Sequence, residues 1–269
     1  MTIAMHPNPS KVDQLLRIAA REELLPRFAR GFSQASRQMK LDGSLLTEAD
    51  LAMNARLREE LARYWPDIGF LSEEAPMEEQ RDLLRAPPPL FWCLDPLDGT
   101  SNFAAGLPFF AVSLALIEEG RSILGVIHDP IRNESFVAAK GQGTTCNGKR
   151  LILEAANIPL ESSIALVNFK HLDAQLALRL MQFPPYGSQR NYGASALEWA
   201  WLAAGRGHIA LHGGQWIWDV AAGSLIFTEA GGVCTTLDGR EFLNLTLDPC
   251  SVIAARDDAL FMAWRDWLG

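Results

Sequence analysis

The chain has 269 residues, of which 48% are hydrophobic and 21% are charged. This composition excludes a disordered chain and fits one large domain or two tightly packed lobes. The formal net charge is −8. Without a basic cluster, such a chain is a poor electrostatic match for the phosphate backbone of a nucleic-acid polymer.

The N-terminus and the cysteines indicate the cellular compartment. Residues 1–10 lack a positive segment followed by an apolar core, so we expect no secretory signal. The longest uncharged stretch, 99–117, begins with polar residues and contains Pro108, which argues against a membrane span. The four cysteines are scattered, which disfavours a disulfide scaffold and structural zinc. We therefore expect a soluble cytoplasmic protein with reduced thiols.

Helical periodicity dominates the beginning of the chain. Apolar residues recur at helical spacing within 11–39, and a second helix is predicted over 48–64, before a proline. Between them, 41–47 contains Asp42-Gly43 and is predicted to form a turn. Residues 77–89 are charged and then rich in proline, and we expect a surface loop there.

The remainder of the chain mixes strands with helices. Strands are predicted over 90–94, 109–117, 122–128, 134–139, 162–168, 208–211 and 251–255. The dipeptides Glu119-Gly120 and Asn147-Gly148 fit the turns of antiparallel hairpins. Helices are predicted over 194–204, 220–230 and 258–268. This mixture predicts a layered α+β fold.

The segment Asp95-Pro96-Leu97-Asp98-Gly99-Thr100 is the strongest candidate for chemistry. Two carboxylates this close repel each other unless a cation lies between them, and hard divalent cations prefer oxygen ligands. The alternative is an ordinary Asp-Gly turn with a capping aspartate. Further acids at Asp50, Glu73 and Asp219 favour a functional site over an isolated turn, although Asp219 alone is most simply a helix N-cap.

Four segments together resemble the inositol monophosphatase family of magnesium-dependent, lithium-sensitive phosphomonoesterases. Leu94–Phe103 and Trp218–Gly232 resemble its two signature segments, and Lys40–Asp50 and Ser72–Glu74 are similar to its two upstream motifs. The matches follow the family's order over nearly the whole chain. The resemblance implies an αβαβα layered sandwich of the sugar-phosphatase type.

The resemblance also implies a division of the chain and a set of metal ligands. The metal and phosphate motifs would lie in an N-terminal lobe of about residues 1–155, and the substrate side and the third metal-ligand segment in a C-terminal lobe of about 156–269. Two or three Mg²⁺ ions are implied. The ligands of the first would be Glu73, Asp95 and the Leu97 carbonyl. Those of the second would be Asp95, Asp98 and Asp219.

Catalytic and phosphate-binding roles follow from the same resemblance. Asp50 would accept a hydrogen bond from Thr100, and Thr100 with Glu73 would orient the attacking water. The phosphate would lie on the backbone N–H groups of Gly99 and Thr100 and on the Ser101 hydroxyl. These residue types suit the chemistry, because a dianionic phosphate repels hydroxide until cations and helix N–H groups neutralise its charge.

Two residues lie where the resemblance places the substrate. Ser195 could suggest a nucleophile, but a small residue that opens a packed helix is the other interpretation. Family members generally carry an acid six positions before Trp218, which binds substrate hydroxyls, and here that residue is His212. A neutral imidazole can form one such hydrogen bond, whereas an imidazolium favours a second anionic group. The alternative is a surface-loop histidine.

Three functional hypotheses remain open on the sequence. The first is a Mg²⁺-dependent phosphatase that hydrolyses a small polyol or sugar monophosphate by metal-activated water, with inositol 1-phosphate as the default. The second keeps the enzyme class but takes histidinol phosphate or 3′-phosphoadenosine 5′-phosphate. The third is a non-catalytic metal-binding regulatory protein. We expect a small phosphorylated metabolite as partner, no nucleic-acid polymer and no membrane, and the family analogy leaves a homodimer open.

Overall fold

The computed structural model describes residues 6–29, 37–39, 45–240, 242 and 245–269. The Asp42-Gly43 turn and the first part of the Lys40–Asp50 motif, 40–44, lie outside the described residues. All four cysteines are free thiols. Among the described helices, none combines the length and the apolar character needed to cross a membrane.

Two sheets form the framework of the molecule. The larger sheet contains, in spatial order, β3 (Gly69–Ser72), β4 (Leu90–Asp98), β5 (Ala111–Glu118), β6 (Arg121–Asp129), β7 (Glu134–Ala139), β8 (Gly143–Cys146) and β9 (Lys149–Leu151). The smaller sheet contains β11 (Ser188–Arg190), β10 (Ile164–Asn168), β12 (Ile209–Gln215), β14 (Cys250–Ala255) and β13 (Val233–Thr235). A separate ribbon pairs β1 (Arg37–Met39) with β2 (Leu45–Thr47).

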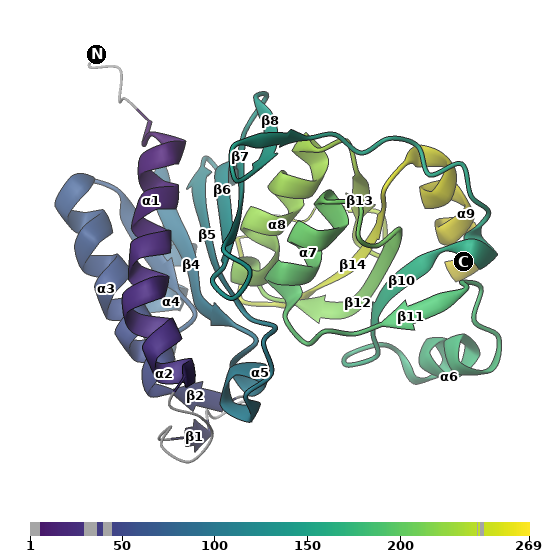
Figure 1. Cartoon of the computed structure of the whole chain (residues 1–269), viewed down its shortest axis with the longest axis horizontal. Helices are drawn as coiled ribbons and strands as arrows, with labels where there is room; N and C mark the ends of the chain where they lie inside the picture. The colour runs from purple at the N-terminus through teal and green to yellow at the C-terminus, as the bar shows by residue number, and fades with distance from the viewer. Residues whose placement is uncertain (1–5, 30–36, 40–44, 241, 243–244) are drawn as a thin grey trace.

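Helices form three layers around these sheets (Figure 1). The outer layer on the larger sheet contains α1 (Pro9–Ala19), a π-helical turn (Ala20–Leu24), α2 (Leu25–Ala29) and α3 (Glu48–Tyr64). The layer between the sheets contains α7 (Ser195–Ala203) and α8 (Ile217–Glu229). The far side of the smaller sheet carries α6 (Ala174–Gln182) and α9 (Asp258–Leu268). The short helices α4 (Met77–Arg85) and α5 (Thr100–Ala105) complete the fold. The αβαβα sandwich predicted from the resemblance is therefore confirmed.

The central helix α8 lies unusually close to its neighbours because of two glycines. A Cβ on Gly223 would lie 2.5 Å from Cγ of Trp199 on α7, and a Cβ on Gly125 of β6 would lie 2.8 Å from the Ala222 carbonyl. Two serine hydroxyls of the larger sheet also donate to backbone carbonyls of α8. Both sheets thus bury this helix, which explains why its sequence is apolar on every face.

Several predicted elements are confirmed and three need correction. The 48–64 helix and both predicted hairpin turns are present, and Glu119-Gly120 and Asn147-Gly148 all have the positive φ of type I′ turns. The 11–39 helix was predicted too long, because its apolar repeat ends at Phe28 and Arg37–Met39 is a strand. The end of the predicted 41–47 turn is also a strand, since Leu45–Thr47 pairs with those residues.

The predicted surface loop over 77–89 is wrong, because its first part is helix α4. Gln80 and Leu84 are four residues apart and are both buried, so the helix has an inward face despite its charged sequence. The Gln80 amide donates to the carbonyls of Ser72 (2.8 Å) and Glu73 (3.0 Å). This helix therefore holds the chain at Glu73, one of the predicted metal ligands.

Candidate active site

A β-bulge in β4 brings the side chains of Asp95 and Asp98 together. On a regular strand, residues three apart point to opposite faces. Here Asp95 lies opposite Ser113 and Asp98 opposite Ala111, so β4 contains one more residue than β5 between these pairs. The extra residue returns both carboxylates to one side. Pro96 lies inside the bulge, where its missing N–H costs no ladder hydrogen bond.

Gly99 turns the chain from β4 into α5. Its φ is +90°, and a Cβ would lie 2.8 Å from the Phe109 carbonyl, so only glycine fits. The turn places Thr100 as the first residue of α5 and Ser101 as the second. The first N–H groups of a helix have no partner within the helix, so they are suited to an anion.

Asp219 joins the two β4 carboxylates from α8. One ligand oxygen from each of Asp95, Asp98 and Asp219 lies within 4.8 Å of the others. Each carboxylate also accepts a backbone N–H, from Leu97 (3.0 Å), Ala196 (2.8 Å) and Trp216 (2.8 Å) respectively. Asp219 is the third residue of its helix, so the N-cap position assigned to it as the simpler alternative is wrong.

Glu73 approaches this cluster from the neighbouring strand. β3 and β4 are parallel, with Ser72 opposite Leu94, so the next residues are Glu73 and Asp95. The Glu73 N–H donates to the Leu94 carbonyl (3.1 Å). Burial is the largest cause of the raised pKa values of Asp98 and Asp219, and the negative charge of Glu73 adds to it. Four predicted carboxylate ligands therefore lie in one region, although Glu73 is outside the 4.8 Å group.

The predicted pair of Asp50 and Thr100 is present. The Thr100 hydroxyl lies 3.0 Å from Asp50 Oδ1 and 3.0 Å from the Leu97 carbonyl. The second oxygen of Asp50 accepts the N–H (2.7 Å) and the hydroxyl (2.6 Å) of Thr47. Burial raises the pKa of Asp50 to about 6. The carboxylate is thus fixed in position and can orient the Thr100 hydroxyl.

The electrostatics of the cluster fit a hard divalent cation. Burial raises the pKa of Asp98 to about 7, and burial followed by the charge of Asp98 raises that of Asp219 well above its ordinary value. Grouped buried carboxylates are costly unless a cation lies among them. All donors here are oxygens, which is the donor set that Mg²⁺ prefers. The residues therefore fit the predicted metal.

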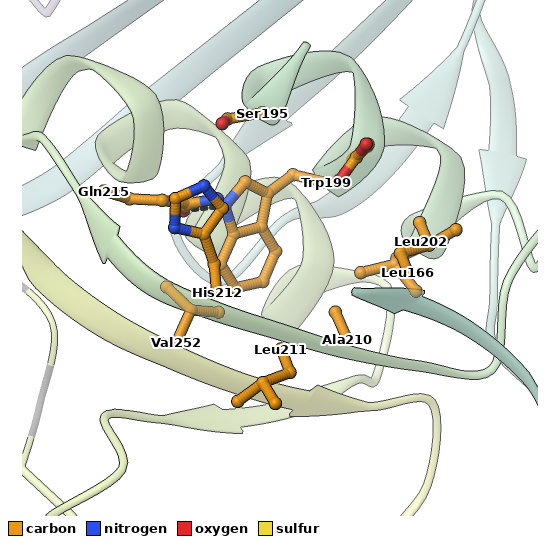
Figure 2. Close-up of a pocket in the computed structure, with 10 residues that line it drawn as sticks. Leu166, Ser195, Trp199, Leu202, Ala210, Leu211, His212, Gln215 and Val252 are labelled. Atoms are coloured by element: carbon orange, nitrogen blue, oxygen red, sulfur yellow. Dashed lines mark hydrogen bonds between the residues drawn. The ribbon is translucent and has the colours of Figure 1, made fainter. Parts of the chain in front are cut away.

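Asp98 links the carboxylates to the predicted substrate side. Its Oδ2 accepts the N–H groups of Ala196 and Leu197 in the first turn of α7. Ser195 is the first residue of that helix. It lines a pocket that also contains His212, and Figure 2 shows the Ser195 hydroxyl and the imidazole near one end of this pocket, with Leu166 and Leu202 at the other.

His212 lies on β12 with only 8% of its surface exposed, so the surface-loop interpretation is wrong. Its Nδ1 accepts the Gly214 N–H (3.0 Å), and its Nε2 lies 3.0 Å from Nδ2 of Asn168. Burial, followed by the nearby His171 and Lys170, lowers the pKa of His212 to about 4. The side chain is therefore a neutral imidazole and not the imidazolium that the sequence left open.

Sequence reasoning missed Glu198, an acid that lines the same pocket. Its carboxylate accepts the Tyr192 N–H (2.6 Å), and burial raises its pKa to about 7. It also missed Asn168, which no local pattern marks. Ser195-Ala196-Leu197-Glu198 has the spacing of a capping box, but the N-cap is Ala194 and Glu198 accepts the Tyr192 N–H, so this pattern does not mark the pocket.

Known proteins match the chain over nearly all of its length. A sequence model of the inositol monophosphatase family matches residues 9–265. The chain belongs to the inositol monophosphatase family. This confirms the predicted resemblance.

The relatives of this chain carry different names. The Nus factor SuhB of Pasteurella multocida is 35% identical over 211 residues, 77% of either chain. An inositol-1-monophosphatase of Mesorhizobium japonicum is 34% identical over 225 residues, 81% of either chain. The crystal structure of the extragenic suppressor protein suhB of Bartonella henselae has a TM-score of 0.84 and 29% identity, and the match covers 96% of this chain and 97% of that one.

Proposed function

We propose that this member of the inositol monophosphatase family is a Mg²⁺-dependent phosphomonoesterase that hydrolyses a small polyol or sugar monophosphate, with inositol 1-phosphate as the default substrate. The observation that carries the proposal is the convergence of Asp95, Asp98 and Asp219 within 4.8 Å, beside the fixed Asp50–Thr100 pair. The inositol-1-monophosphatase relative of Mesorhizobium japonicum supports the same reaction class.

The five metal ligands in this proposal come from the end of β3, the bulge of β4 and the start of α8. Glu73, Asp95 and the Leu97 carbonyl would hold the first ion, and Asp95, Asp98 and Asp219 would hold the second, so that Asp95 is common to both. Bound Mg²⁺ would neutralise the phosphate charge, lower the pKa of a water molecule and stabilise the leaving oxygen.

Thr100 and Asp50 would orient the water. A hydroxyl has a single hydrogen, and Thr100 directs it to Asp50 or to the Leu97 carbonyl. Its lone pairs can then accept a hydrogen from water and turn the water oxygen toward phosphorus. Glu73, which follows the parallel neighbouring strand β3, would orient the same water together with Thr100.

The phosphate would lie at the start of α5. It would bind to the backbone N–H groups of Gly99 and Thr100, which lie at the left-handed turn and at the first residue of the helix. The Ser101 hydroxyl would add a further donor, and Ser195 and His212 would face the leaving group from the adjoining pocket.

A second candidate function is a regulatory role without turnover. It is favoured by relatives named Nus factor SuhB, of which the Pasteurella multocida protein is 35% identical to this chain. In that case the carboxylate cluster would serve as a metal-binding structural element.

A phosphate-release screen with Mg²⁺ separates the two candidates. It should include inositol phosphates, sugar phosphates, histidinol phosphate and 3′-phosphoadenosine 5′-phosphate. We expect Mg²⁺-dependent turnover of at least one ester, and its loss in Asp98→Asn. Absence of turnover on every ester by folded, Mg²⁺-loaded protein would favour the regulatory role.

A further inference from the structure

The contact between Asn168 and His212 contains more N–H donors than acceptors. The two residues are opposite each other in the parallel pairing of β10 with β12, so their side chains lie on the same face. Asn168 Nδ2 lies 3.0 Å from His212 Nε2. Asn168 Oδ1 already accepts the Lys170 N–H (2.9 Å), and His212 Nδ1 already accepts the Gly214 N–H (3.0 Å).

No placement of hydrogens satisfies all of these groups. A neutral imidazole carries one N–H, and because Nδ1 accepts from Gly214, that hydrogen lies on Nε2 and faces the Asn168 amide. If the Asn168 side-chain amide is rotated by 180°, its oxygen accepts the His212 N–H, but its NH₂ group then faces the Lys170 N–H, so two donors again face each other. Moving the ring hydrogen to Nδ1 creates the same conflict at Gly214. One acceptor is missing in every case.

The loop that follows β10 brings positive charge to the same place. Its residue Lys170 lies close enough to affect the pKa values of both His212 and Asp219. The loop is held against β12, because the α-carbon of Gly213 has no side chain and a Cβ there would lie 2.1 Å from the His171 carbonyl. The surplus N–H groups therefore lie beside a loop that carries a positive charge, and the N–H of Lys170 itself is bound to Asn168.

We propose that Asn168, His212 and Lys170 form a subsite for an anionic oxygen, of a carboxylate or a second phosphate, on the leaving group of the substrate. A single such oxygen would accept the N–H groups of both Asn168 and His212 and would supply the missing acceptor. The inference rests on the proposed phosphatase function, because it takes the pocket shared by Ser195 and His212 as the leaving-group side.

The subsite changes the ranking of substrates within the proposed function. A cationic leaving group such as that of histidinol phosphate would meet N–H donors and Lys170, whereas a bisphosphate or a phosphorylated acid would be complementary. One acid, Glu198, lines the same pocket, but its carboxylate accepts the Tyr192 N–H on the preceding loop.

The test compares two esters that differ by one group. Glycerol 3-phosphate carries CH₂OH where 3-phosphoglycerate carries a carboxylate. We expect kcat/KM of the wild type with Mg²⁺ to be roughly tenfold or more higher for 3-phosphoglycerate, as for a charge-assisted hydrogen bond. A ratio near one would overturn the subsite.

Asn168→Asp provides the sharpest variant. An aspartate can accept from both the Lys170 N–H and the His212 Nε2–H, so it supplies the missing acceptor within the protein. We expect Tm to stay equal or rise while the preference for 3-phosphoglycerate falls by about tenfold or more. The control is Asn157→Asp, which adds the same charge at an exposed position and should keep the wild-type ratio.

Lys170→Gln is a second variant that does not depend on the buried contact, because Lys170 is exposed. It should lower the preference for 3-phosphoglycerate about two- to fivefold, as expected for an exposed charge.

An unchanged ratio in both Asn168→Asp and Lys170→Gln would overturn the subsite. Absence of turnover on both esters and on p-nitrophenyl phosphate would contradict the proposed function instead. The Tm of Asn168→Asp is a separate readout. A clear decrease would contradict the claim that the contact between Asn168 and His212 lacks an acceptor.

Discussion

The Thr100 hydroxyl donates a hydrogen bond to Asp50 Oδ1 over 3.0 Å, although the two residues are 50 positions apart. The same aspartate accepts the N–H and hydroxyl of Thr47 and so caps its own helix, α3. The pair therefore joins the first turn of α3 to the first turn of α5. The role of this pair in positioning water can be tested without removing any of the predicted metal ligands.

Thr100→Ala should reduce kcat roughly 10²-fold or more, because the water would lose the hydroxyl that positions it. Steady-state kinetics on a hydrolysed ester should show a smaller change in KM. Thr100→Ser retains the hydroxyl and is the control, with kcat close to wild type. A large rise in KM at normal kcat would show that Thr100 is only a phosphate ligand.

Asp95→Asn should abolish Mg²⁺-dependent phosphate release while the fold remains intact, because Asp95 is proposed to contact both cations. An asparagine carbonyl can still accept the Leu97 N–H, so the bulge should persist. Mg²⁺ should raise the Tm of the wild type by preferential binding to the folded state, and much less that of the variant. Asp67→Asn, at an exposed position, is the matched control. Normal hydrolysis by folded Asp95→Asn would refute the site.

His212→Glu should shift preference toward inositol 1-phosphate and away from 3-phosphoglycerate. A carboxylate here can accept the Gly214 N–H and the Asn168 amide, and it can accept substrate hydroxyls. An unpaired buried polar group costs about 1–3 kcal/mol, or roughly 5- to 150-fold in discrimination. The kcat on a generic phosphate ester should change little. An identical substrate ranking before and after the substitution would contradict this role.

His128 should make stability depend on pH. It is buried on β6, with Nδ1 3.0 Å from the Ser135 hydroxyl, and burial lowers its pKa from 6.5 to about 4. Between these values the unfolded chain binds a proton that the folded chain does not, so this contribution to the free energy of unfolding falls as pH decreases. From about pH 7.5 to about pH 5, the wild type should lose about 2 kcal/mol more than His128→Gln.

Denaturant unfolding at both pH values checks this difference. Buried carboxylates with raised pKa values act in the opposite direction, because they favour the folded state at low pH. Their effect on the free energy of unfolding is the same in the wild type and in His128→Gln, so it cancels in the difference between the two proteins. Parallel pH profiles for the wild type and His128→Gln would show that the buried imidazole does not contribute.

Local sequence patterns are enough to predict much of the metal half of the site. Asp95 and Asp98 follow a continuous apolar run, which marks a buried strand end, and Gly99 marks the turn after it. Thr100, Glu73, Asp50 and Asp219 were recognised because four local motifs resemble one family, and each motif is short enough to be read along the chain. The same local signals predict the two hairpin turns and a helix over 220–230, which overlaps most of α8.

Tertiary structure alone decided which of these residues meet and what surrounds the leaving group. The bulge that turns Asp95 and Asp98 to one side is visible only in the pairing with β5. Helix α4 consists mostly of strong helix formers and could have been predicted, whereas the contacts of Gln80 with Ser72 and Glu73 depend on the tertiary structure. Asn168 lies opposite His212 only because β10 and β12 pair, 44 residues apart. Periodicity reports which face of an element is buried, but it carries no information about the neighbour that buries it, and hydrogen-bond balance depends on that neighbour.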